Sequence, residues 1–146
     1  MQITSVSTTD LAVRLRLTIA RMARRLRQEA GAELSPSLGS ALASIDRFGP
    51  LTPSELAQRE RVRRPTITRV LARLEEAGLV ERAADPADGR SSLVTTTAEG
   101  RALLGEQRTR KDAYLAARID SLDAEDRATL DRAAAILERL LEEDRP

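Results

Sequence analysis

Residues 52–80 read TPSELAQRERVRRPTITRVLARLEEAGLV, and two helices joined by a short turn can be recognised in them. The opening TPSE is a capping box with proline at the first helical position. We therefore expect a short helix over residues 53–60 and a second over 64–77, which Gly78 ends. The apolar residues of the second helix recur at helical spacing and form its inner face: Ile67, Val70, Leu71 and Leu74.

The periodicity changes after this second helix. Residues 79–83 can form a strand, and residues 93–96 are rich in β-branched side chains and suit a return strand. Between them the segment DPADGR, residues 85–90, is dense in turn-forming residues. These segments together predict a hairpin whose polar tip carries Arg90.

Amphipathic helices are expected before and after this central piece. Residues 10–30 repeat apolar side chains at spacings of three and four, with Asp10 as the N-cap and Gly31 as the stop. A helix over 36–48 follows the pair Ser35-Pro36. Two more are expected after the hairpin, over 98–119 behind Thr97 and over 124–142 behind Asp123.

The resulting order is α-α-α-α-β-β-α-α, a mainly α protein with a small β-hairpin wing. This is the order of a winged helix-turn-helix with flanking helices. We expect one domain with three segments: a first helix in residues 1–34, the winged helix-turn-helix in 35–97, and two terminal helices in 98–146. The apolar stripes of the outer helices fit either the core of a single chain or the interface of a homodimer.

Composition narrows the classes of function. The 146 residues are 41% hydrophobic and 32% charged, which is typical of one soluble globular domain. No apolar run approaches the ~20 residues that span a bilayer, and no signal segment is visible, so we expect a cytoplasmic protein that binds no membrane. The chain has no cysteine and no histidine. Disulfides, thiolate and imidazole catalysis and the usual zinc sites are therefore excluded, and we expect no enzyme, no metal and no cofactor.

Charge is distributed unevenly along the chain. The net charge is only +1, but residues 59–73 hold six arginines against one acidic residue, Glu60. Residues 1–31 are also basic, and residues 97–146 carry more acidic than basic groups. Positive charge concentrated on one segment is typical of a nucleic-acid-binding surface.

The basic segment coincides with the outer face of the predicted second helix. An α-helix fits the major groove, where arginine can donate two hydrogen bonds to guanine and a threonine methyl can pack on thymine. Arg90 at the hairpin tip can enter a minor groove. The candidate contacts to double-stranded DNA on and beside the helix are Arg63, Arg64, Pro65, Thr66, Thr68, Arg69 and Arg73. The alternatives are a solvated surface and a winged-helix module that binds another protein; the basic segment favours DNA.

In the order and spacing of its motifs the chain resembles the MarR family, the multiple antibiotic resistance regulators. The matching segments are LTPSELA (51–57), PTITRVLARLEEAGLV (65–80), DPADGR (85–90) and the Thr-x-x-Gly that begins at Thr97. The resemblance implies a homodimer with interlocked terminal helices that binds pseudo-palindromic operators, usually as a repressor. It also implies that Asp88 orients Arg90.

A small, commonly aromatic or phenolic, effector that releases the DNA is implied by the same resemblance. Met22, Phe48 and Tyr114 are candidate residues for the effector pocket, with ordinary core packing as the alternative. Two positions depart from the family pattern. Thr96 replaces an apolar residue, so we expect looser packing at the base of the wing. Arg63 replaces an N-cap acceptor, a role that a bound phosphate beside Arg63 and Arg64 could take.

Overall fold

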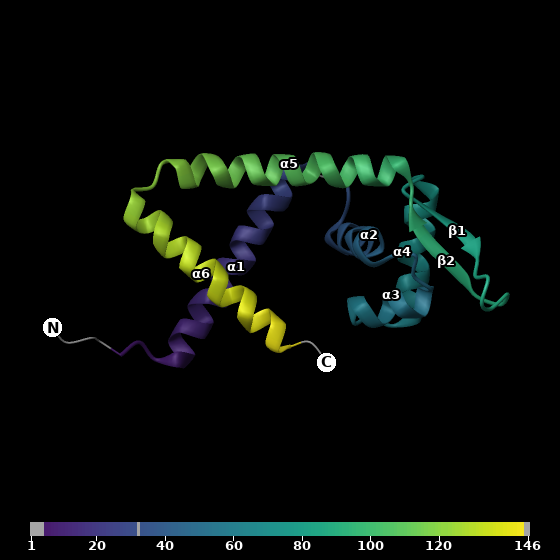
Figure 1. The fold of residues 1–146 in the computed structure, drawn as a ribbon, viewed down its shortest axis with the longest axis horizontal. Helices are drawn as coiled ribbons and strands as arrows, with labels where there is room; N and C mark the ends of the chain where they lie inside the picture. Colours follow the sequence, from purple (N-terminus) through teal and green to yellow (C-terminus); the bar gives the residue numbers. More distant parts are fainter. Residues whose placement is uncertain (1–4, 32, 145–146) are drawn as a thin grey trace. The chain divides into compact units, whose positions relative to one another are not determined.

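A computed structural model describes residues 5–31 and 33–144 of the chain. Within these residues there are six helices and a two-stranded antiparallel sheet, in the order expected from the sequence (Figure 1). The elements are α1 (Thr8–Ala30), α2 (Pro36–Phe48), α3 (Pro53–Glu60), α4 (Arg64–Glu76), β1 (Val80–Ala84), β2 (Ser92–Thr96), α5 (Ala98–Asp120) and α6 (Ala124–Glu143).

Internal contacts divide the chain into two units, residues 1–111 and residues 112–146. The first unit contains α1 to α4, the hairpin and the first part of α5. The second contains the rest of α5 and α6. The three segments expected from the sequence stay a prediction, and their ends at residues 1–4 and 145–146, together with residue 32, lie outside the described residues.

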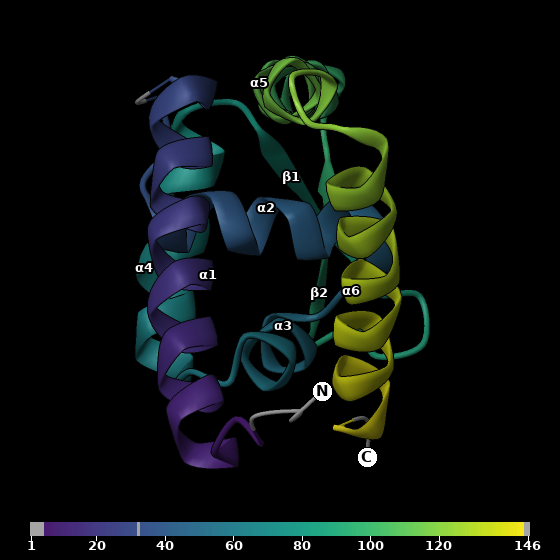
Figure 2. The ribbon, with the colours of Figure 1, turned by 90° about the vertical axis from the view of Figure 1, so that its left-hand side faces the viewer.

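The core of the first unit lies between α2, α3, α4 and the hairpin. In Figure 2, α2 runs across the hairpin with α3 beside it, and both helices contact β2 and α4. All four residues of the predicted inner face of α4 are buried. The largest side chains that are fully buried come from three helices and one strand: Leu42, Ile45, Leu56, Ile67, Leu71, Leu74 and Val94.

Side-chain caps fix where most of the helices begin. The hydroxyl of Ser35 accepts the Leu38 N–H, and that of Thr52 accepts the Glu55 N–H, which confirms the predicted starts of α2 and α3. The predicted cap of α1 is wrong. Ser7 caps α1 by accepting the N–H of Asp10, because a serine one turn earlier offers an acceptor before Asp10 is reached.

The opposite end of α4 is joined to the hairpin by backbone hydrogen bonds. Gly78 has a φ of 74°, a left-handed conformation that residues other than glycine rarely adopt. Its N–H donates to the Glu75 carbonyl and the N–H of Leu79 donates to the Leu74 carbonyl, both at 2.9 Å, which is a Schellman motif. From the start of α5, the Thr97 hydroxyl donates to the Gly78 carbonyl at 2.7 Å. The end of α4 is therefore tied to the end of the hairpin.

The strands pair with Val80 opposite Thr96 and Ala84 opposite Ser92. The expected strand over 79–83 is shifted by one residue at both ends, because Leu79 belongs to the Schellman turn, and β2 begins one residue earlier than expected, at Ser92. The looser packing predicted at the base of the wing is not observed, since Thr96 is only 7% exposed. The departure appears instead as a buried Thr96 hydroxyl that has no hydrogen-bond partner among the described residues.

Helices α1 and α6 bury very little. Among the described side chains of α1 only Ala30 is buried, and among those of α6 none is. Within its own unit each helix therefore buries little apolar surface, and the choice between the core of a single chain and the interface of a homodimer stays a prediction. Large apolar side chains are exposed on both helices: Leu11, Val13, Leu17, Ile19 and Met22 on α1, and Leu130, Ile136, Leu140 and Leu141 on α6. None of the described helices is both long enough and apolar enough to cross a membrane.

Candidate nucleic-acid interface

The two faces of α4 differ sharply in chemistry. Its inner face is the apolar core described above, while its outer face carries cationic and small polar side chains. Of the residues predicted to read DNA, Thr66 is half-buried and the others on this helix are exposed: Arg64, Pro65, Thr68, Arg69 and Arg73. The structure thus brings these side chains to one helix surface, as the helical spacing predicts.

At the first turn of α4 none of the described side chains caps the helix. Arg63 occupies the N-cap position and its side chain accepts no hydrogen bond. The hydroxyl of Thr68 donates to the Arg64 carbonyl at 3.0 Å. Because that hydroxyl proton is already used, the methyl group of Thr68 is the part best suited to contact a base, through the methyl group of thymine.

Only some arginines of residues 59–73 have partners within the protein. Arg64 donates to the Ser54 hydroxyl of α3. The guanidinium carbon of Arg59 lies 3.7 Å from the centre of the Phe48 ring, within cation–π range. In the described part of the chain, four arginine side chains of the segment form no hydrogen bond, ion pair or ring contact: Arg61, Arg63, Arg69 and Arg73. These groups are free to bind an external anion such as phosphate.

The loop that joins the two strands is ordered by its own aspartates. Asp85 Oδ1 accepts the Ala87 N–H at 2.9 Å, and Asp88 Oδ1 accepts the Arg90 N–H at 3.0 Å. The Ser91 carbonyl accepts the Asp85 N–H and closes the loop at 3.1 Å. Arg90 is exposed at the tip, which projects beyond the helices of the first unit (Figure 1). The role of Asp85 was not predicted, although Asp-Pro is a turn-forming pair that points to it.

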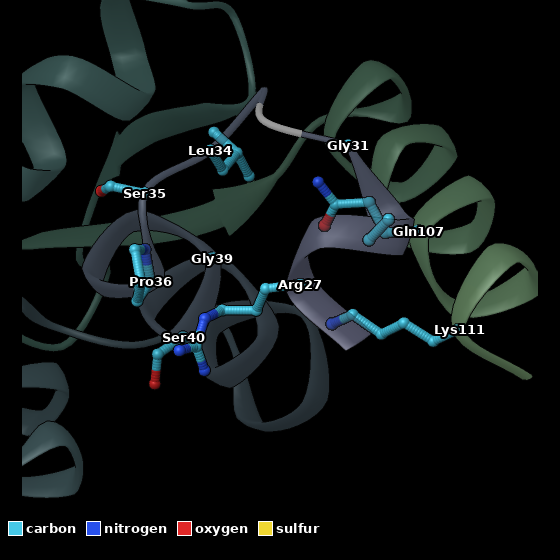
Figure 3. Close-up of a pocket in the computed structure, with 10 residues that line it drawn as sticks. Arg27, Gly31, Leu34, Ser35, Pro36, Gly39, Ser40, Gln107 and Lys111 are labelled. Carbon is cyan, nitrogen blue, oxygen red and sulfur yellow. The ribbon is translucent and has the colours of Figure 1, made fainter. Parts of the chain in front are cut away.

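Three elements of the first unit line a cationic cavity: the last turn of α1, α2 and α5. Arg27 extends from α1 toward Ser40 of α2, while Gln107 and Lys111 reach in from α5 (Figure 3). An adjoining cavity of about 380 Å³ shares Gln107 and Lys111. Arg110 of α5 donates to the Ala30 carbonyl at 3.0 Å, which ties α5 to the end of α1. A small anion is the ligand that these charges suit.

The residues predicted for an effector pocket lie in different surroundings. Met22 is 40% exposed on α1, and Phe48 is 41% exposed at the end of α2 with Arg59 against its ring. Tyr114 belongs to the second unit, where Arg118 lies over its ring at 3.9 Å. None of the three lines the cavity of Figure 3. Their role as pocket residues stays a prediction. No group of acidic side chains able to hold a metal ion occurs in the described residues.

A helix-turn-helix followed by a paired wing, with arginines along the second helix, defines a winged helix-turn-helix protein with a cationic recognition-helix surface. Comparisons with known proteins agree. The family model described as MarR family matches residues 34–92. An uncharacterized HTH-type transcriptional regulator of Mycobacterium bovis is 39% identical over 134 residues, which cover 91% of this chain and 94% of that protein. The chain belongs to the MarR family.

Solved structures show the same fold. A Pseudomonas aeruginosa protein described as a transcriptional regulator is 36% identical, with a TM-score of 0.81 over 93% of this chain and 99% of that one. Streptococcus pneumoniae FabT, solved in complex with DNA, is 20% identical, with a TM-score of 0.73 over 95% of this chain and 100% of that one. The second likeness concerns the fold alone.

Proposed function

We propose that the protein is a homodimeric repressor that binds a pseudo-palindromic operator in double-stranded DNA. The observation that carries this proposal is the outer face of α4, where Arg69 and Arg73 are exposed and have no partner among the described residues. Unpaired arginines on a helix that fits the major groove can donate hydrogen bonds both to guanine edges and to phosphates. Arg90 on the ordered wing supplies a minor-groove contact. The DNA in the FabT structure supports the same use of this fold.

Dimerisation is part of the proposal because α1 and α6 leave apolar side chains uncovered. Leu17 and Ile19 of α1 are 43% and 50% exposed, and Leu140 and Leu141 of α6 are 53% and 70% exposed. Large apolar side chains exposed in this number mark an interface in a soluble protein. A second copy of the chain satisfies both helices at once, and two recognition helices would then read two half-sites about 34–36 Å apart.

A small anionic effector, aromatic or phenolic, is the second part of the proposal. It is supported by the cavity of Figure 3, which is lined by Arg27, Lys111 and polar groups of α2. The cavity lies between α5, the end of α1 and α2, and α2 in turn packs against α4. A ligand that fits only one arrangement of these helices would shift the affinity for DNA. We further propose that the regulator acts in the cytoplasm, and that its activity is the binding of DNA and not catalysis.

The test is selection of binding sites from random duplex DNA with the purified protein, followed by affinity measurements at several salt concentrations. We expect one enriched sequence with two-fold symmetry. If a dimer neutralises about eight phosphates, log K should fall against log salt with a slope of about −7. Recovery of no sequence and a slope near zero would favour the alternative, a winged-helix module that binds protein.

A further inference from the structure

Glu60 is the only acidic residue within residues 59–73. It is the last residue of α3, and Arg61 continues the chain in a left-handed conformation with a φ of 53°. Arg61 and Arg63 follow it within three residues, so their side chains are within reach of a carboxylate at this point. An ion pair there would neutralise one of the cations beside α4.

The structure shows the Glu60 carboxylate bound elsewhere. The hydroxyl of Ser40 donates to Glu60 Oε2 at 2.8 Å, and the hydroxyl of Ser44 donates to Oε1 at 2.7 Å. The two serines are four residues apart on α2, one above the other on the same helix face. Each carboxylate oxygen therefore has its own donor, and both donors come from a helix that carries none of the predicted DNA contacts.

These bonds are strong for side-chain contacts. A hydroxyl that donates to an ionised carboxylate makes a charge-assisted hydrogen bond, about twice as strong as a neutral one. Glu60 is half-buried and lines a groove between α2 and α4 together with Val62 and Thr66. Arg61 and Arg63 remain exposed, without an ion pair in the part of the chain that the structure describes.

We propose that Ser40 and Ser44 are positioning residues that hold the Glu60 carboxylate away from Arg61 and Arg63 and so keep these arginines available for DNA phosphates. The inference rests on the proposed binding of DNA. Without the two hydroxyls the carboxylate turns to the neighbouring arginines, and one phosphate contact per protomer is lost. Each phosphate contributes about 0.9 to the salt slope, so the slope of a dimer should become shallower by roughly 1.8.

The experiment is a cycle of four proteins on one selected operator: the wild type, S40A/S44A, E60Q, and the triple variant S40A/S44A/E60Q. S40A/S44A should bind roughly 60-fold more weakly at 0.1 M salt, with the shallower slope. E60Q should bind at least as tightly as the wild type, because the amide removes the charge that could compete. The triple variant should regain the wild-type slope, since no carboxylate is left to pair with the arginines.

Rescue by a further substitution separates this role from a purely structural one. If the serines only hold α3 against α2, the triple variant will bind no better than S40A/S44A, and the proposal is overturned. The matched control is S40A/S44A/E76Q, which removes an exposed carboxylate at the end of α4. Equal rescue by E76Q would show a general charge effect and would also overturn the proposal.

The same experiments also control for loss of folding in the variants. The salt slope does not depend on the fraction of active protein, and thermal melts of all the variants report their stability. A wild-type protein that binds no DNA would refute the proposed function and this inference with it. Wild-type binding with an unchanged slope in S40A/S44A would refute only the role of the serines.

Discussion

The main-chain N–H of Arg90 donates to Oδ1 of Asp88 at 3.0 Å, so the aspartate orders the arginine through the backbone. No ion pair joins these two described side chains. The second carboxylate oxygen of Asp88 accepts the Ser91 hydroxyl at 3.4 Å, which fixes the turn from the other side. Asp88 thus shapes the tip of the wing in the protein without DNA.

Replacing Asp88 by asparagine or by alanine should therefore give different results. Asparagine keeps the acceptor oxygen of the turn, so Asp88→Asn should bind DNA within about twofold of the wild type. Alanine removes that acceptor, and ordering Arg90 on binding should then cost about 1–2 kcal/mol per protomer. Fluorescence anisotropy with the selected operator measures both. Equal losses in the two variants would show that the negative charge, and not the turn, is what matters.

Arg69 and Arg90 should fail in different ways when each is changed to alanine. Arg69 lies on the outer face of α4, so its loss should cost about 1–3 kcal/mol and relax the preference at one base pair in each half-site. Arg90 lies at the wing, so its loss should weaken binding to all sites, most at those with A·T flanks. Both side chains are exposed, so melting should change little. A panel of single-base operator variants checks this, and unaltered selectivity in both mutants would contradict the placement.

A charge on the exposed stripe of α1 should break the dimer. Ile19 is 50% exposed in the single chain, and Ile19→Glu would bury a carboxylate in the proposed interface. Sedimentation should then show a monomer, with operator affinity reduced by at least an order of magnitude because one recognition helix is lost from each complex. An unchanged dimer in Ile19→Glu would place the interface elsewhere.

Two glycines of α5 should respond oppositely to alanine. A Cβ at Gly100 would lie 2.3 Å from the Leu79 carbonyl oxygen, a backbone atom that cannot move aside cheaply, so Gly100→Ala should destabilise the protein by several kcal/mol. A Cβ at Gly105 meets nothing described within 4 Å. Gly105→Ala should therefore raise stability by about 1 kcal/mol through helix propensity. Denaturant unfolding compares the two, and equal effects would contradict the close packing at the base of the wing.

Local signals in the sequence were sufficient for most of the fold. The N-cap at Thr52, the glycine stop at Gly78 and the apolar face of α4 each depend on residues within one or two helical turns, and all three are confirmed. The reciprocal bond of a capping box is replaced by one from the Thr52 hydroxyl to Glu55 Oε1. The error at the start of α1 arose because Ser7 and Asp10 are both good N-caps and spacing alone does not choose between them.

The sequence did not predict contacts between side chains that lie far apart along the chain. The bonds from Ser40 and Ser44 to Glu60 span 20 and 16 residues, and no periodic pattern marks them. Phe48 illustrates the same limit. The contact of its ring with the guanidinium of Arg59, eleven residues away, is not marked by any pattern in the sequence, while its predicted role in an effector pocket stays a prediction. The outer face of α4 was predictable because helical spacing alone assigns residues to a face.

The bonds that tie Thr97 to Gly78 and Leu79 have a consequence for the operator itself. They join the recognition helix to the base of the hairpin, so the separation between the α4 contacts and the Arg90 contact is set by the protein. One extra base pair between the two contacted stretches lengthens the duplex by about 3.4 Å and rotates it by roughly a tenth of a turn. Such an operator keeps every contacted base, yet the helix and the wing cannot engage it together. If the protein binds DNA as proposed, spacing within each half-site is thus part of the sequence that it would read.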